Sequence, residues 1–429
     1  MLRTHYVAQL KPEMENRRVK IAGWLHEVRN IGKISFMQVR DHTGIAQVTA
    51  KLGDVGEEII KSTSMPKESV IAVTGIVKRN PQSKSGFEII PEKILNLNPL
   101  EDRIPFDVTS KVPAELDVRL NYRHIDLRRL ETTSVFNIES TVLSTFRGIL
   151  LKQKFQEMRT PTIVDEATEG GAELFGVKYF EKTVYLAQSP QLYKQLAVIG
   201  GMDKVFMVLP VFRAEKFDTP FHLNEATQMD IEMGFADHND AIKVLVKVAS
   251  GIEAEVIKKN APDLERLGHK LEKSKPVVVT YKKALQRLNE NDHKLEFGND
   301  FSREHETALS ELYGDMLVVK EYPTAIRAFY SMPNKKDPEI SNSYDLLYKG
   351  LEISSGAQRI HISKLLEEQM LKRGMNPKNF EFYLTAFKQG APPHAGWSIG
   401  LERFVMKLSG MQNIREASMF PRDRNRVIP

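Results

Sequence analysis

The sequence predicts an α+β protein in which a small β-barrel is followed by a larger region of helices and strands. Two observations lead to this prediction. Short apolar runs alternate with turn-forming residues through residues 1–101, whereas the remaining sequence mixes helical periodicity with strand-like runs. The length of 429 residues fits two or three domains with a sizeable buried core.

Composition limits the chemistry that the chain can perform. It is 41% hydrophobic and 27% charged, and it contains no cysteine. Disulfides, thiolate metal centres and cysteine nucleophiles are therefore excluded. The N-terminus does not resemble a signal peptide, and no apolar run approaches the roughly 20 residues that span a bilayer. We expect a cytoplasmic protein with no membrane partner and with catalysis by oxygen and nitrogen groups.

The net charge of +5 is concentrated in the first quarter of the chain. Residues 1–100 contain 15 Lys and Arg against 10 Asp and Glu, so 15 − 10 gives +5, and the remaining residues hold 46 of each sign. A charge of this size does not by itself identify a partner. Its location makes the predicted barrel the cationic part of the molecule.

The barrel strands are predicted over residues 19–28, 33–41, 44–50, 69–77 and 86–97, with turn-forming segments between them. Five strands in about 100 residues fit an OB-type barrel, whose open face commonly binds single-stranded nucleic acid. Strand parity places Phe36 beside Gln38 and Arg40, as base stacking and phosphate attraction require. Parity alone is equally compatible with a Phe36 that closes the barrel core.

A hinge is predicted next, over residues 102–131, where irregular sequence precedes a cationic stretch. The second domain would span residues 132–429, with an insertion around 236–330 in which no chemistry is readable. Its first element is an amphipathic helix with apolar residues at steps of three and four. These residues are Val135, Ile138, Val142, Phe146 and Ile149. A strand broken by Pro161 follows.

Candidate binding residues begin in two neighbouring segments. TEGGAELF combines Glu169 with two glycines, a mobile-loop composition, and SPQLYKQ places Gln191 and Lys194 one helical turn apart. Further on, PVFRAEKFDTPFHLNEATQMDIEMGF reads as two strands joined by a loop. Arg213 and Glu215 are expected on the first strand, and Asp230 and Glu232 project to one side of the second.

Two later segments add carboxylates and cations. In SYDLLYKGLEISSGAQRIH, Asp345 and Glu352 lie in strand-like sequence and could bind magnesium together with substrate phosphates. Ser355 and Arg359 are expected to follow around a turn of small residues. In HAGWSIGLERFVMKLSG, glycines precede an apolar helix bearing Arg403, an arrangement that suits phosphate.

Taken in order, these segments resemble a known family. The helix ending at Pro161, FRAE and GLER resemble motifs 1, 2 and 3 of class II aminoacyl-tRNA synthetases. TEGGAELF, SPQLYKQ, ISSGAQR and FPRDR resemble the aspartyl-tRNA synthetases of archaeal and eukaryotic type, in subclass IIb. The resemblance covers essentially the whole chain.

The resemblance implies a catalytic domain built on an antiparallel sheet flanked by helices. It also implies that ATP and Mg²⁺ activate L-aspartate as an aspartyl-adenylate, from which the aspartyl group passes to tRNA without a covalent enzyme intermediate. A homodimer would form around the motif 1 helix and Pro161. Among the residues matched to the family, Arg213, Glu352 and Arg403 would be catalytic.

The matched positions form three sites. The ATP site would comprise Arg213, Ala214, Glu215, Phe221, His222, Leu223, Glu352, Gly400, Leu401, Glu402 and Arg403. The aspartate site would comprise Glu169, Ser189, Gln191, Lys194, Arg213, Asp230, Ser355 and Arg359. Asp345, Glu352 and Ser355 would hold magnesium. Relatives often have a basic residue at Phe221 and an aromatic at Ala226, so the residue that stacks on adenine stays open.

Within this arrangement, Lys194 and Arg359 would supply the cations that the aspartate side chain needs. Neutral asparagine there would leave charge uncompensated, at a cost on the order of several kcal/mol, and lysine would be repelled. Arg213 would hold the α-phosphate and the reacting carboxylate, and Asp230 would accept from the substrate ammonium group.

The barrel would read the anticodon through His26, Arg29, Phe36, Gln47 and Lys84. By the same resemblance, Phe36 would stack on a base and Gln47 would hydrogen-bond to one. His26 stands where enzymes strict for tRNA(Asp) can carry tryptophan, which favours an enzyme that also charges tRNA(Asn). Lys84 favours the strict alternative, so we expect relaxed specificity by a small margin.

Two other classes of protein are alternatives to a tRNA synthetase. A tRNA-independent synthetase paralogue would generally lack the anticodon barrel. A non-catalytic RNA-binding protein would be expected to lose Arg213, Glu352 or Arg403, and all three are present.

Overall fold

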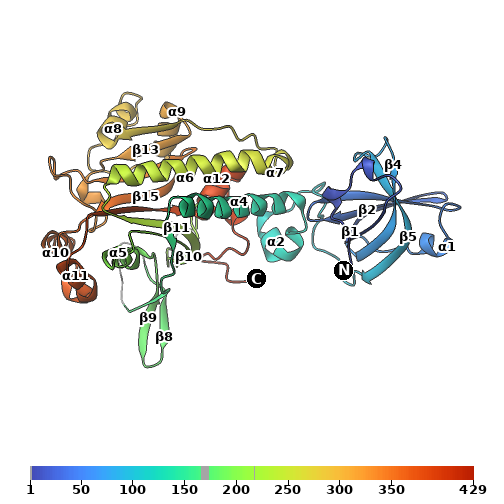
Figure 1. Cartoon of the computed structure of the whole chain (residues 1–429), viewed down its shortest axis with the longest axis horizontal. Helices are drawn as coiled ribbons and strands as arrows, with labels where there is room; N and C mark the ends of the chain where they lie inside the picture. Colours follow the sequence, from blue (N-terminus) through green and yellow to red (C-terminus); the bar gives the residue numbers. More distant parts are fainter. Residues whose placement is uncertain (1, 166–172, 217) are drawn as a thin grey trace. The chain divides into compact units, whose positions relative to one another are not determined.

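The computed structural model describes residues 2–165, 173–216 and 218–429 (Figure 1). Its internal contacts divide it into two compact units. The boundary in the sequence lies between Thr133 and Ser134, and the second unit extends to Ile428. The predicted α+β fold is confirmed: a five-stranded barrel is followed by a mainly antiparallel sheet with helices. The residues expected to form a hinge, 102–131, belong to the first unit.

In the first unit, five strands close into a barrel in the order β1-β2-β3-β5-β4. Their ends lie close to the predicted ones, and β1 extends furthest past its predicted range: β1 (Arg18–Ile31), β2 (Ile34–Asp41), β3 (Gly44–Lys51), β4 (Val70–Arg79) and β5 (Phe87–Asn98). The helices of this unit are η1 (Val7–Gln9), η2 (Pro12–Met14), α1 (Glu57–Lys61), α2 (Leu116–Asn121) and α3 (Arg123–Asp126). Met37 and Val39 are fully buried in the barrel core, as the strand parity predicts.

The second unit is built on an eight-stranded sheet with the order β12-β13-β14-β15-β16-β11-β10-β6. Its strands are β6 (Gln156–Glu157), β10 (Lys204–Phe212), β11 (Glu225–Gly234), β12 (Pro276–Thr280), β13 (Met316–Lys320), β14 (Ser343–Tyr348), β15 (Leu351–Arg359) and β16 (His394–Gly400). All neighbours are antiparallel except the outermost pairs, β12 with β13 and β10 with β6. A small second sheet contains β7 (Ile163–Val164), β8 (Gly176–Tyr179) and β9 (Lys182–Leu186).

Two long helices, α4 (Leu130–Lys152) and α6 (His238–Lys259), run along one face of the large sheet (Figure 1). The predicted apolar stripe of the first of these helices is buried there. The other helices are α5 (Gln191–Ile199), α7 (Ala261–Arg266), α8 (Tyr281–Asn289), α9 (Arg303–Tyr313), α10 (Ser363–Lys372), α11 (Glu381–Lys388), α12 (Leu401–Ser409), η3 (Thr324–Ile326), η4 (Pro377–Phe380) and η5 (Ile414–Ala417). No helix among the described residues is long and apolar enough to cross a membrane.

Two local predictions need correction. Arg213 and Glu215 follow β10 instead of lying on it, because this strand ends at Phe212. Ser355 and Arg359 lie within β15, since the small residues between them pair with β16 instead of turning. Residues 236–330, predicted to form an insertion, supply β12, β13 and the helix α6.

Candidate active site

Two cavities adjoin on the face of the large sheet opposite α4 and α6. The first, of about 150 Å³, we call the nucleotide cavity; it is lined by residues of the loop after β10, by β15 and by the start of α12. The second, of about 280 Å³, we call the amino-acid cavity; it is lined by α5, β11, β15 and the segment after η3. Four residues line both cavities: Arg213, Gln228, Ser355 and Ser398. A ligand in one cavity would therefore lie beside a ligand in the other.

Strand alternation explains how these side chains gather. On β11, Met229 and Ile231 enter the core beneath the helices, so Gln228 and Asp230 face the cavities, as the predicted period of two requires. Backbone pairing then places Ser398 between Asp230 and Ser355 on the neighbouring strands.

The amino-acid cavity has a wall of buried ion pairs. Lys194 Nζ lies 2.6 Å from an Asp230 carboxylate oxygen and 3.6 Å from one of Glu232, and it is 1% exposed. Arg359 donates to both oxygens of Glu232, at 3.0 and 3.3 Å. Burial acts to raise the pKa of Glu232, but the charges of Arg359 and Lys194 outweigh it and lower that pKa. Gly396 pairs with Glu232 on the neighbouring strand. A Cβ atom at this position would lie 2.3 Å from the Glu232 carboxylate, so a side chain would clash there.

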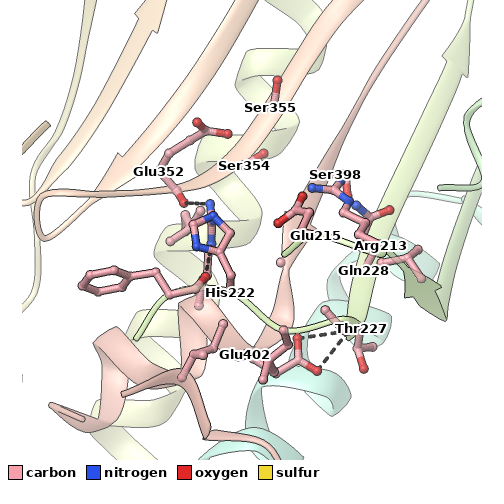
Figure 2. Close-up of a pocket in the computed structure, with 18 residues that line it drawn as sticks. Arg213, Glu215, His222, Thr227, Gln228, Glu352, Ser354, Ser355, Ser398 and Glu402 are labelled. Atoms are coloured by element: carbon pink, nitrogen blue, oxygen red, sulfur yellow. Dashed lines mark hydrogen bonds between the residues drawn. The ribbon is translucent and has the colours of Figure 1, made fainter. Parts of the chain in front are cut away.

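Arg213 is the cationic group at the junction of the two cavities. Its Nε is buried without a hydrogen-bond partner, as is Oε1 of Gln228 beside it (Figure 2). Buried polar atoms are normally paired, so these two atoms, which line both cavities, are candidates for binding a ligand. Lys194, Arg359 and Arg327 all pair with carboxylates, which leaves Arg213 as the surplus positive charge among the described residues that line the amino-acid cavity.

In the nucleotide cavity, Arg403 is held by three groups. Its guanidinium donates to the main-chain oxygens of Phe221 at 3.3 Å and Glu352 at 3.1 Å, and it lies 3.4 Å from His222 Nε2. Burial and the charge of Arg403 lower the pKa of His222. The imidazole is therefore neutral at physiological pH and can act as an acceptor or a donor toward a nucleotide.

The floor of this cavity is formed where α12 begins. Gly400 precedes the helix as its N-cap, and the Glu402 carboxylate accepts hydrogen bonds from the main-chain N–H of Thr227 at 2.9 and 3.0 Å. Burial raises the pKa of Glu402 to about 7. Ala226 also lines the cavity, whereas the Phe221 ring lies under the guanidinium of Arg303, 4.7 Å from its centre.

The predicted magnesium ligands lie on adjacent strands, where Asp345 pairs directly opposite Ser355. A register shift in β14–β15 lets Glu352 reach the same face, and burial followed by the like charge of Asp345 raises the pKa of Glu352 to about 8. A buried carboxyl beside another carboxylate is an oxygen-rich environment that fits a hard cation. However, Asp345 is already paired with Arg327, which donates to both its oxygens at 2.8 and 2.5 Å.

In the barrel, Phe36 is half-buried and lies outside the core. It stands across from Arg29 on one strand and Thr49 on the other, and Gln38 stands across from Gln47. His26 differs, because it occupies a β-bulge and is buried, with its Nδ1 2.6 Å from Arg40. Lys84 is exposed on the β4–β5 loop.

The cavities bring together most of the predicted site. The predicted residues that line at least one cavity are Ser189, Gln191, Lys194, Arg213, Glu215, Phe221, His222, Leu223, Asp230, Glu352, Ser355, Arg359, Gly400, Glu402 and Arg403. Ala214 faces a third cavity, Leu401 is buried in the core, and Pro161 is exposed between β6 and β7. Glu169 lies outside the described residues.

Sequence reasoning missed Gln228, Arg327, Tyr330 and Ser398, all of which line the amino-acid cavity. Gln228 and Ser398 share the strand faces of predicted residues, so period-two alternation could have found them. Arg327 lies in the segment where no chemistry was readable, and only its proximity to Asp345 reveals it.

Comparison with known proteins identifies the family. Residues 115–424 match the model of class II tRNA synthetases for aspartate, lysine and asparagine, and residues 19–97 match an OB-fold nucleic-acid-binding domain of the anticodon type. The chain is 45% identical to the aspartate–tRNA(Asp/Asn) ligase of Methanocaldococcus jannaschii, over 100% of this chain and 98% of that protein. The chain belongs to the aspartate–tRNA ligase family of class II aminoacyl-tRNA synthetases. Class II synthetases use ATP.

Two further relatives share the fold but differ in the tRNA or the amino acid that their names specify. The aspartate–tRNA(Asp) ligase of Thermoplasma volcanium is also 45% identical, over 99% of both chains. Asparaginyl-tRNA synthetase from Pyrococcus horikoshii, solved with asparaginyl-adenylate, superposes with a TM-score of 0.94 at 32% identity and full coverage of both chains. Relatives of both amino-acid specificities therefore share this architecture.

Proposed function

We propose that this protein ligates L-aspartate to tRNA in two steps, forming an aspartyl-adenylate from ATP and then transferring the aspartyl group to the tRNA. One observation carries the residue assignment: the nucleotide and amino-acid cavities share a wall, and Arg213 on that wall has buried donor capacity without a partner. At this position it can bind the attacking carboxylate and the α-phosphate together, which lowers the barrier through positioning and charge neutralisation.

The amino-acid cavity supports aspartate over its relatives. Lys194 and Arg359 would face the side-chain carboxylate, and Asp230 would accept from the substrate ammonium group. Each of these groups is nine-tenths or more buried and fixed by an ion pair, so it is oriented before the substrate arrives. Asparagine would lack the negative charge that these cations attract.

In the nucleotide cavity, Arg403 and His222 would contact the nucleotide, and Glu215 would accept from the adenine amino group. Glu352, with Asp345 and Ser355, would hold Mg²⁺. When bound there, the ion would supply positive charge beside the phosphates. His222 in its neutral form would leave the phosphate contacts to Arg213 and Arg403.

The experiment is aspartate-dependent pyrophosphate exchange by Arg213→Ala. We expect a loss on the order of 1,000-fold, because a charge-stabilising donor aimed at the reacting centre is removed. Arg287→Ala is the matched control, since Arg287 is exposed on α8 and pairs with Glu290. Exchange retained by a folded Arg213→Ala variant would refute the assignment.

For the tRNA substrate, we propose that the barrel binds the anticodon and that the enzyme charges tRNA(Asn) as well as tRNA(Asp). The similarity to the Methanocaldococcus jannaschii enzyme, whose name includes both tRNAs, supports this. Charging of the two purified transcripts tests it. Activity on tRNA(Asp) alone would establish the strict alternative, for which the Thermoplasma volcanium relative is the precedent.

We also propose that the protein is a cytoplasmic homodimer assembled around α4 and Pro161. Exposed apolar side chains support an interface, since Leu151 on α4 is 55% exposed and Ile163, which follows Pro161 in the sequence, is 47% exposed. Light scattering coupled to size-exclusion chromatography tests this proposal, and a monomer at micromolar concentration would contradict it.

A further inference from the structure

Arg327 lies where the predicted magnesium ligands meet the amino-acid cavity. Its NH1 donates to Asp345 Oδ2 at 2.8 Å, and its NH2 donates to Asp345 Oδ1 at 2.5 Å and to Ser355 Oγ at 2.9 Å. The guanidinium also packs against the ring of Tyr322, 4.5 Å from its centre, and the side chain is only 11% exposed. One fixed cation therefore holds two of the three predicted magnesium ligands.

The third predicted ligand has a different environment. In the described part of the chain, the hydrogen bonds of Glu352 involve its main chain: its N–H donates to Glu306 at 3.2 Å and its oxygen accepts from Arg403 at 3.1 Å. The carboxylate of Glu352 is thus available to a cation, whereas that of Asp345 is neutralised. Moreover, no cluster of three or more His, Cys, Asp or Glu residues that could hold a metal occurs among the described residues.

We propose that Arg327 is an internal counter-cation that prevents Asp345 and Ser355 from holding Mg²⁺ before ATP binds, so that the metal enters with the nucleotide. This inference rests on the proposed function, because it takes the magnesium site from it. Mg²⁺ sheds its water reluctantly and is usually bound by one or two carboxylates plus substrate phosphates. With Arg327 in place, the protein offers it the Glu352 carboxyl group, which has no hydrogen-bond or ion-pair partner among the described residues, and the phosphates must supply the negative charge.

Arg327 is a positioning residue in this account, since it acts through Asp345 and Ser355. Asp345 and Ser355 face each other across β14 and β15, and a single NH2 group bridges them. A planar guanidinium makes this two-strand bridge, whereas a lysine ammonium would preserve the charge without the same fork of donors. Charge and geometry can therefore be separated by substitution.

The test is Mg²⁺ binding to the full-length, nucleotide-free protein by isothermal titration calorimetry. Removing a unit charge beside two carboxylates should make Arg327→Gln bind Mg²⁺ at least about tenfold more tightly than the parent protein. Arg327→Lys keeps the charge and should bind as weakly as the parent. Arg287→Gln removes an exposed arginine on α8 and should also leave the affinity unchanged.

Unchanged or weaker Mg²⁺ binding by a folded Arg327→Gln variant would overturn the proposal, as would equal tightening in Arg327→Lys. If the glutamine variant does not melt like the parent, Arg327→His measured at pH 8 repeats the neutralisation with a ring that can still donate to Asp345. A second readout is the Mg²⁺ concentration that half-saturates pyrophosphate exchange at fixed ATP, which should fall in Arg327→Gln. Absence of exchange by the parent protein would instead refute the proposed function.

Discussion

The barrel and the large sheet each present a polar face, and the two faces differ in how their side chains are held. At the polar face of the large sheet, Lys194 of α5 and Arg359 of β15 are at most 3% exposed and are held in ion pairs with carboxylates of β11. On the barrel, Phe36 is half-buried, and Arg29 and Lys84 are exposed. The first face is organised before any ligand arrives, whereas the second offers accessible groups on a closed scaffold.

This difference matches the ligands that the two faces are proposed to bind. A small charged substrate must be held in one geometry for reaction, so its binding groups have to be desolvated and fixed in advance. A nucleotide base in an RNA loop is bound by stacking and by attraction of its phosphates, which tolerate more freedom. Substitutions on the sheet should therefore affect activation strongly, and substitutions on the barrel should affect only the tRNA-dependent step.

The largest effect is expected from Arg359→Leu. It removes the cation proposed to face the aspartate side chain and leaves Glu232 with Lys194 at 3.6 Å as its remaining partner. Loss of the buried charge that would pair with the substrate carboxylate costs about 2–5 kcal/mol of binding free energy, so aspartate-dependent exchange should fall by on the order of 1,000-fold. Exchange kinetics at varied aspartate measure this, with ATP binding followed separately.

Arg359→Lys is the companion variant for this prediction. It keeps the charge and should recover part of the aspartate affinity, while loss of the fork geometry limits the recovery. If Arg359→Leu binds aspartate normally and melts like the parent protein, the amino-acid cavity does not select its ligand by charge, and the comparison between the two faces fails.

A smaller effect is expected from Gln228→Leu, which should raise the stability of the ligand-free protein and lower its exchange activity. Oε1 of Gln228 is buried without a partner, so its removal should stabilise the ligand-free protein by about 1 kcal/mol, which raises Tm by about 2–4 °C. Exchange should fall about tenfold, because a group aimed at the substrate is lost. Thermal melting and exchange kinetics on the same preparation check both signs. A variant that is both less stable and less active would show that Gln228 has a structural role.

The sequence predicts a site residue when strand alternation alone decides which way its side chain faces, and it fails when a distant contact or a register shift decides this. Asp230, Ser355 and Arg359 lie on strands, where alternation assigns a face without knowledge of the neighbours. Glu352 reaches that face only because of the register shift in β14–β15, which no local pattern shows. Arg327 could not be recognised from the sequence, because its proposed function depends on a contact with Asp345, which follows it by 18 residues and lies on a strand.

The barrel shows the same limit. Alternation correctly separates Phe36 from Met37 and Val39, so the choice between core and surface for Phe36 is decided by structure in favour of the outer face. The environment of His26 was not predictable, because a β-bulge turns its side chain toward Arg40. The base contacts of these residues remain proposals.

Phe36→Ala tests the barrel half of the comparison. Loss of one stacking platform costs about 1–3 kcal/mol, so the kcat/KM for tRNA charging should fall by roughly 5- to 100-fold while pyrophosphate exchange is unchanged. Leu97→Ala, which truncates an apolar side chain that is 39% exposed on β5, is the control and should change neither rate. A parallel loss in charging and exchange would assign Phe36 to the fold instead of the RNA.

The smallest effect concerns stability beneath the catalytic sheet. Burial, and then the charge of Glu402, raises the pKa of Glu139 on α4 from 4.5 to about 7. The folded protein therefore holds this proton more tightly than the unfolded chain does. Ionisation of this buried carboxyl group destabilises the folded state. The free energy of unfolding therefore falls as pH rises from about 4.5 through 7.

Glu139→Gln removes this titration and should raise Tm by about 2 °C or more at pH 8 while changing it little near pH 4.5. The control is Glu255→Gln on α6, because a hydrogen bond from Lys259 lowers the pKa of that carboxyl group. Its substitution should bring no gain at pH 8. Differential scanning calorimetry at both pH values measures the two shifts. A pH-independent change in Glu139→Gln would mean that packing, and not the buried charge beside Glu402, determines the cost at this position.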